Sequence, residues 1–312
     1  MAATLTDGPQ AGGVLPESPT GLAGGVSGWA NKRERLLVGG VTAALFIALF
    51  FEPFVLLVQD WWTVPEAGHG LLLAPVAIWL AWKAGLGSGR VAAPIAGLII
   101  LAIAVLIRLA SGLAAELFSM RASMVMALFA LVVHYWGWSQ ARRWFLPFLL
   151  VSLSIPLPEL VTQALALPLQ FKASQMGAAL LGLRHVPVLL TGNVIRLPGH
   201  ELFVTEACSG LRSLTALLST GVLLASVALK RPGTRVLLVV SAVPIAVVIN
   251  GVRVFLTGFL VFFVSPKFGT GFMHLTEGWL LFLVSLGSLA LVASAMAFVE
   301  KRVARRSEAK NA

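Results

Sequence analysis

The stretch that decides the fold is RVLLVVSAVPIAVVINGVRVFLTGFLVFFV, residues 235–264, in which Arg235 and Arg253 are the only charged side chains. A helix crosses the hydrocarbon core of a bilayer with about 20 apolar residues, so this stretch predicts a membrane-spanning helix. The sequence holds further apolar stretches of sufficient width near 36–58, 92–110, 208–229 and 275–299, and shorter ones near 67–82, 118–137 and 144–157. We therefore predict an all-α integral membrane protein with about eight transmembrane helices.

The overall composition agrees with a membrane protein. The chain has 312 residues, of which 58% are hydrophobic and 12% are charged. Soluble domains average about 45–50% apolar and about 25% charged residues, so a soluble globular domain, a disordered chain and a coiled coil are excluded. The single cysteine, Cys208, excludes an intrachain disulfide and leaves a free thiol or a packed core residue.

The basic residues predict the orientation in the membrane. The net charge of +10 would suit nucleic acid, but the basic residues concentrate in segments that alternate along the chain with the other loops, which is the pattern of cytoplasmic loops. We therefore expect both termini in the cytoplasm, an even number of crossings and no nucleic-acid partner. These segments hold Lys32, Arg33, Arg35; Lys83, Arg90; Arg142, Arg143; Lys230, Arg231, Arg235; and Lys301, Arg302, Arg305, Arg306, Lys310.

The predicted organisation has three parts. Residues 1–31, rich in Ala, Gly, Pro, Ser and Thr, are expected to be a disordered cytoplasmic tail and not a signal peptide. Residues 32–300 form the membrane domain, and residues 301–312 form a basic cytoplasmic tail. The cytoplasmic (inner) membrane is the predicted location.

The segment before the third long span must begin and end on the outer side of the membrane. Its residues 159–183 include several glutamines, a glutamate and a lysine among apolar residues, which favours an interfacial or re-entrant helix; a plain membrane helix is the alternative. The following stretch, VPVLLTGNVIRLPGHELFV at 186–204, has β-branched runs broken by Thr191-Gly192-Asn193 and by Pro198-Gly199-His200. This pattern predicts a short outer β-ribbon.

Three reactive side chains come to one depth in this topology. Cys208 begins a span at its outer end, and Arg253 lies about 27 Å of helical rise beyond Arg235, in the outer half of the next span. His274 precedes the last span, again on the outer side. Ionisable residues in membranes are costly and often functional, so the topology predicts a site at the outer leaflet.

This trio suits acyl transfer through a thioester. A thiolate is the nucleophile, and its pKa falls at a helix N-terminus or beside a cation such as Arg212, four residues after Cys208. His274 suits a general acid and base, and Arg253 suits the oxyanion formed when an amide carbonyl is attacked. The alternatives are a packed thiol, an arginine reaching phosphates and a capping histidine. No metal-ligand spacing or phosphate-binding loop occurs, so we expect no cofactor and no metal.

The string EACSGLRSL at 206–214 resembles the exosortase and archaeosortase family of membrane cysteine transpeptidases. Further matching motifs follow in the family's order over about residues 60–299. They are GHG at 68–70 with Trp79 and Trp82 beyond it, SIPLPEL at 154–160, GNVIRLPG at 192–199, NGVRV at 250–254 and HLTEGWLLF at 274–282.

The resemblance implies that Cys208 is the nucleophile, with Arg253 and His274 as its catalytic partners. It adds substrate-binding or secondary candidates, namely Arg212, Glu206, His69 and Asn250. The implied substrates are membrane-anchored exported proteins with a C-terminal motif such as Pro-Glu-Pro, then a membrane helix and a basic tail. The enzyme would cleave near the motif and transfer the protein to another anchor, with its active site on the outer side.

Two other classes of function stay open from the sequence. A membrane transporter or lipid-handling protein would bind an anionic group through Arg253 and have little use for Cys208. A scaffold for exopolysaccharide export would tolerate loss of any one member of the trio.

Overall fold

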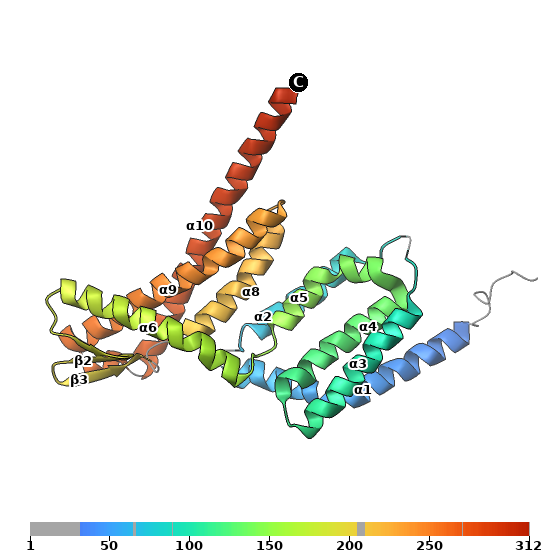
Figure 1. Ribbon diagram of the computed structural model, residues 1–312, viewed down its shortest axis with the longest axis horizontal. Coiled ribbons are helices and arrows are strands. Elements are labelled where there is room, and N and C mark those ends of the chain that lie inside the picture. The colour runs from blue at the N-terminus through green and yellow to red at the C-terminus, as the bar shows by residue number, and fades with distance from the viewer. Residues whose placement is uncertain (1–31, 65–66, 89, 205–209, 270, 312) are drawn as a thin grey trace, which may run out of the picture. The chain divides into compact units, whose positions relative to one another are not determined.

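The computed structural model describes residues 32–311 apart from 65–66, 89, 205–209 and 270, and it consists of helices with one small sheet (Figure 1). The first helices are α1 Lys32–Thr63, α2 Gly70–Ala84, α3 Pro94–Leu113, α4 Leu117–Arg143, α5 Phe145–Leu153 and α6 Glu159–Leu183. The strands β1 Leu189–Thr191, β2 Val194–Leu197 and β3 His200–Phe203 follow, and then α8 Gly210–Ala228, α9 Pro232–Phe263, the 3-10 helix η1 Pro266–Gly269 and α10 Gly271–Asn311.

The predicted fold class is confirmed. Each apolar stretch found in the sequence contains a helix in its described part, and five helices are long and apolar enough to cross a bilayer: Leu36–Thr63, Pro94–Leu113, Leu117–Arg143, Pro232–Phe263 and Gly278–Arg306. Two shorter apolar helices, Gly70–Ala84 and Leu214–Ala228, accompany them. The tail predicted for residues 1–31 lies outside the described residues, and α10 continues as a helix through the basic residues that follow 300.

The chain divides into two compact units, Met1–Leu49 and Phe50–Ala312. In the first unit the described residues form the first half of α1, and most of their large apolar side chains are exposed, for example Leu36, Val41 and Leu45. A helix with an apolar surface suits lipid as its solvent. The second unit holds all the other elements.

The predicted short span at 144–157 is a shorter helix than expected. α5 has nine residues, a rise of about 14 Å against a hydrocarbon core about 30 Å thick. It ends before Pro156 because the residue that precedes a proline disfavours the helical conformation. Its Leu150 packs with Leu73 and Ala77 of α2 in one buried cluster, so a pair of short helices occupies this part of the second unit.

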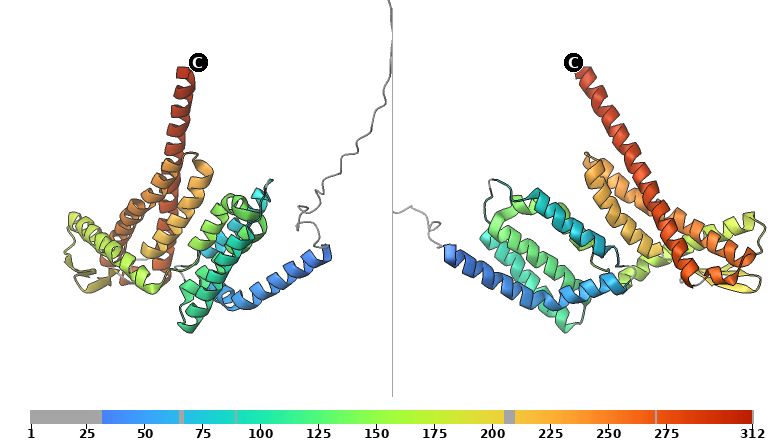
Figure 2. Two further views of the ribbon diagram at one scale, coloured as in Figure 1. Left: turned by 45° about the vertical axis from the view of Figure 1, so that its right-hand side comes forward. Right: turned by 180° about the vertical axis from the view of Figure 1, so that it is seen from behind.

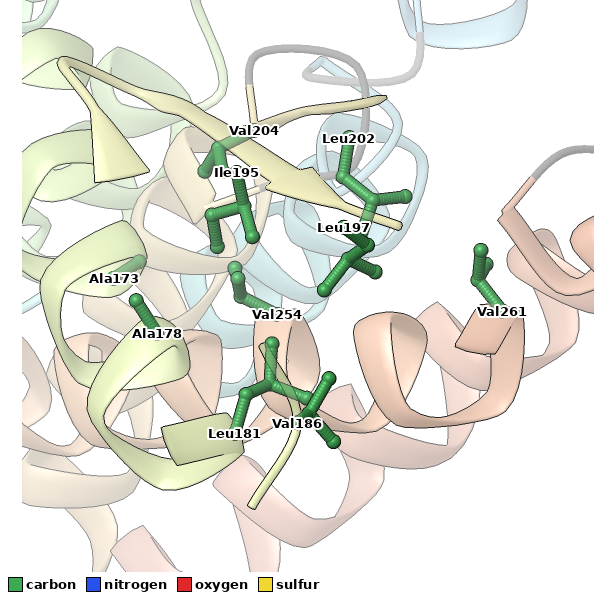
Figure 3. Close-up of a cluster of buried hydrophobic side chains, with 10 residues drawn as sticks. All are labelled: Ala173, Ala178, Leu181, Val186, Ile195, Leu197, Leu202, Val204, Val254 and Val261. Carbon is green, nitrogen blue, oxygen red and sulfur yellow. The ribbon is translucent and has the colours of Figure 1, made fainter. Parts of the chain in front are cut away.

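The β-ribbon is confirmed as a three-stranded antiparallel sheet in the order β1-β2-β3. One face of the sheet is buried against α6 and α9, and α6 has the predicted bounds (Figure 3). The backbones of α6 and α9 approach closely: a Cβ on Gly177 would stand 2.5 Å from Val254 and a Cβ on Gly251 would stand 2.6 Å from Met176. Glycines allow such close helix packing, so α6 and the buried face of the sheet both pack on the second half of α9.

The helices α8, α9 and α10 lie side by side (Figure 2) and share a buried cluster that includes Leu217, Leu238 and Leu289. The loop between α8 and α9 is held by the Glu300 carboxylate of α10. It accepts the backbone N–H groups of Lys230 at 3.0 Å and of Arg231 at 3.1 Å, and also the Thr234 hydroxyl. An anion at the start of a helix satisfies N–H groups that lack partners within the helix.

Candidate active site

Arg253 is the best-defined member of the predicted trio. It lies ten residues before the end of α9, and only 5% of its surface is exposed. The guanidinium packs on Gly278 of α10: a Cβ atom built on Gly278 would stand 2.9 Å from Nη2 and 3.2 Å from Cζ of Arg253. Only a glycine at position 278 leaves the guanidinium this place between the two helices.

A small crevice between α9 and α10 opens beside the guanidinium. Arg253 and the buried Asn250 line it from α9, and Gly278 and Ser285 line it from α10 together with apolar side chains. Its volume of about 10 Å³ is close to the space that one water molecule needs. The crevice therefore brings a fixed positive charge and an amide to one buried place, an arrangement that suits a developing negative charge.

The start of α8 lies at the level of this crevice. Gly210 precedes the end of α8 by 18 residues, and Asn250 follows the start of α9 by 18 residues. Because the two helices leave one short loop, equal lengths of about 27 Å bring Gly210 and Asn250 to one level. The shared cluster of Leu214 and Ala246, each 14 residues from its end of the loop, supports this alignment.

The other predicted residues are located by backbone alone or not at all. Cys208 and Glu206 lie outside the described residues, and Cys208 precedes α8 by two positions in the sequence. The backbone places Arg212 in the first turn of α8 and His274 one helical turn before Gly278 in α10, while their side chains lie outside the described part. The catalytic roles of these residues stay predictions.

His69 has a defined place in the structure. It precedes α2, and its Nε2 is 3.0 Å from the carbonyl oxygen of Leu153. The indole of Trp61 donates to the next carbonyl, that of Ser154, at 2.8 Å. These two bonds fasten the end of α5 to the turn between α1 and α2. The His69 ring thus helps to position the backbone here, and its place in the predicted site stays a prediction.

A buried ion pair that the sequence did not predict joins α4 to α1. Arg121 of α4, with 3% of its side chain exposed, lies 2.8 Å from the Asp60 carboxylate of α1, of which 27% is exposed. Arg121 lies within the predicted span 118–137, and Asp60 lies just beyond the predicted span 36–58. A charged residue in or beside a span is a signal that would have found both. The pairing itself joins residues 61 positions apart and needs the three-dimensional structure.

Glu116 stands at the start of the same helix, α4. Its carboxylate accepts the backbone N–H of Phe118 at 3.0 Å and of Ser119 at 2.7 Å, as a helix N-cap does. Hydrogen bonding from Ser119, together with the bond from Phe118 and the charge of Arg121, lowers the pKa of Glu116 below its ordinary value of 4.5. Within the described ranges, no three His, Cys, Asp or Glu side chains gather as a metal site.

The chain was compared with known families, curated proteins and solved structures. A profile of the family described as transmembrane exosortase matches residues 61–291. This range begins at Trp61 and includes the sheet, α8, α9 and the crevice residues of α10. No curated protein and no solved structure matches the chain.

Proposed function

The chain belongs to the transmembrane exosortase family, a family of membrane cysteine transpeptidases, and we propose that it cleaves the C-terminal sorting signals of exported proteins through a thioester on Cys208. Arg253 and His274 are the proposed catalytic partners. Arg212, Glu206, His69 and Asn250 are proposed to contact the substrate or to support the trio.

The proposed reaction has two halves. The Cys208 thiolate attacks the carbonyl carbon of the scissile amide, and the guanidinium of Arg253 stabilises the oxyanion. His274 gives its proton to the departing amine as the C–N bond breaks, which leaves the substrate as a thioester. An acceptor then loses a proton to His274, attacks the thioester and releases the thiolate. The acceptor is water in hydrolysis and the amine or hydroxyl of an anchor in transfer.

The proposed substrate is already in the membrane. A C-terminal helix anchors it, and its short motif emerges beside the outer leaflet, where the trio is expected. Only this juxtamembrane motif has to reach the thiol. The substrate's basic tail stays on the cytoplasmic side, as do both termini of the enzyme under the positive-inside rule.

One observation carries the proposal. The Arg253 guanidinium packs on Gly278, which follows His274 by one helical turn. The helix α8 begins at this level, two residues after Cys208 in the sequence. The start of α8, the Arg253 segment of α9 and the start of α10 therefore support a site at one level of these three helices. A thiol near a helix N-terminus and a cation also has the surroundings that favour its thiolate form.

The test follows the size of a co-expressed substrate that carries a motif, a helix and a basic tail. We expect the wild type to shorten it and Cys208→Ala to leave it at full length, because no other nucleophile replaces the thiol. His274→Gln is expected to lose processing, whereas the matched variant His185→Asn keeps it. His185 is exposed, lies in a turn and has a φ of 58° that asparagine also adopts.

The outcome separates the classes of function. Processing by Cys208→Ala would contradict the thiol mechanism and favour a transporter or lipid-handling protein that uses Arg253. Loss of processing with normal amounts of protein in the membrane would exclude the export scaffold. Mass spectrometry of the shortened substrate then identifies the new C-terminus and whether an anchor was attached.

A further inference from the structure

Some backbone N–H and C=O groups of the strand β3 point away from the neighbouring strand β2. The N–H of Val204 donates to the carbonyl oxygen of Asn193 at 3.0 Å, and these two residues continue the register in which Val194 faces Phe203. Antiparallel pairs alternate between bonded and non-bonded positions, so Leu202 also directs its N–H and C=O toward β2. Glu201 and Phe203 therefore direct theirs toward the open side.

This open side is an edge of the sheet. The strand order places β3 at one margin, and no described residue forms a backbone bond to Glu201 or Phe203 on that side. The side chains of both residues are about half exposed, Glu201 at 50% and Phe203 at 48%. The other margin, β1, lies against α6. An uncovered edge of this kind is a template for another strand.

The edge is held rigidly beside the proposed active site. Leu202 and Val204 are buried in the cluster that also contains Val254, the neighbour of Arg253 (Figure 3). Phe203 precedes Cys208 by five positions, at most about 17 Å of extended chain. A peptide that paired with β3 would thus lie within reach of the thiol.

We propose that the edge of β3 binds the juxtamembrane motif of the substrate as an added antiparallel strand, an inference that rests on the proposed function. Glu201 and Phe203 each supply one N–H and one C=O, about 6.8 Å apart along the strand. They bond alternate residues of the substrate backbone. Main-chain pairing gives affinity for an extended peptide of many sequences, and it also fixes the peptide for attack.

The choice of occupant follows from the membrane. A chain that leaves its transmembrane helix has unpaired peptide groups close to a medium that offers no hydrogen bonds. A sheet edge at this level satisfies them while keeping the chain extended, the conformation in which one carbonyl is open to a nucleophile. A second copy of this chain pairing edge to edge is the competing occupant.

Proline substitution tests the backbone directly. Glu201→Pro and Phe203→Pro remove an outward N–H but no bond to β2, and prolines are tolerated on edge strands. The reference variants Glu201→Ala and Phe203→Ala lose the same side chains but keep the N–H. We expect each proline variant to process substrate about 3- to 10-fold more slowly than its alanine reference, the usual effect of one hydrogen bond. Equal rates in proline and alanine variants with normal thermal unfolding would overturn the proposal.

Photo-cross-linking provides a second measurement that does not need turnover. A benzoylphenylalanine at position 203, combined with Cys208→Ala, is expected to cross-link the substrate's motif. The same probe at Leu189, which is 60% exposed on the opposite margin, is the matched control. Cross-links from both positions, from neither, or to a second copy of the chain would contradict the edge proposal. If the wild type itself leaves the substrate uncut, the proposed function fails while this binding test still applies.

Discussion

Two buried arginines lie in different regions of the molecule and have different surroundings. Arg121, in the region of α1 and α4, is closed in against the Asp60 carboxylate. Arg253, in the region of α8 to α10, packs on a glycine and lines a crevice with Asn250. The difference teaches that burial of a charge in a membrane protein does not identify a site. What distinguishes Arg253 is the space beside it.

The largest expected effect is on Arg253. Arg253→Lys keeps the charge but loses the planar fork of donors, and we expect processing to fall about 10²- to 10³-fold, the usual cost of removing an oxyanion donor. Arg121→Lys keeps an ion pair with Asp60 and is expected to process substrate near the wild-type rate. Similar losses in the two variants would erase the functional difference between the arginines. Initial rates in membranes, normalised to enzyme amount, measure both.

The second prediction concerns stability at the Asp60–Arg121 pair. Asp60→Asn leaves a buried guanidinium without its counter-charge and is expected to lower the free energy of unfolding by about 3 kcal/mol or more. Arg121→Met leaves the more exposed Asp60 carboxylate and should cost less. The double variant is expected to lose less than the sum. Unfolding in detergent micelles measures the cycle, and additive losses would show that the two side chains do not interact.

The third prediction tests the space beside Arg253. Gly278→Ala places a methyl group at 2.9 Å from Nη2, and the flexible guanidinium moves away at little cost to folding. We expect processing to fall about 10-fold, equivalent to about 1.4 kcal/mol, with unfolding unchanged or slightly improved by the gain in helix propensity. Gly287→Ala on the same helix has nothing within 4 Å and is the control. A Gly278→Ala enzyme as fast as the control would mean that the guanidinium position is unimportant.

The smallest expected effect is a pH dependence at the start of α4. The pKa of Glu116 is lowered in the folded state, chiefly by its hydrogen bonding to Ser119, so its carboxylate contributes stability above the ordinary value of 4.5. That contribution disappears as the pH falls through the lower folded pKa. The unfolding midpoints of wild type and Glu116→Gln should therefore differ at pH 6 and converge below pH 4.5. A constant difference between these pH values would contradict the assignment.

The sequence predicted the helices better than the contacts between them. Apolar length predicted the long spans, and polar residues within an apolar stretch predicted α6 with its observed bounds. The position of Arg253 along α9 followed from counting residues along one helix. The rotation of that helix about its axis could not be counted in this way. Neither the contact of Arg253 with Gly278 nor the pairing of Asp60 with Arg121 was therefore predicted. The interruption of α4 at Gly137 was not predicted either, whereas α2 and α9 continue through Pro75 and Pro244.

The hydrogen bonds from the α8–α9 loop to the Glu300 carboxylate hold one end of both helices in place. Because this loop is fixed, the positions of Gly210 along α8 and of Asn250 along α9 can both be measured from it. One residue inserted into α8 between Gly210 and Ala228 would turn Gly210 about the helix axis by about 100° and move it by about 1.5 Å relative to Asn250. The alignment of Gly210 with Asn250 therefore depends on the number of helical residues between each of them and the three-residue loop, about 27 Å away.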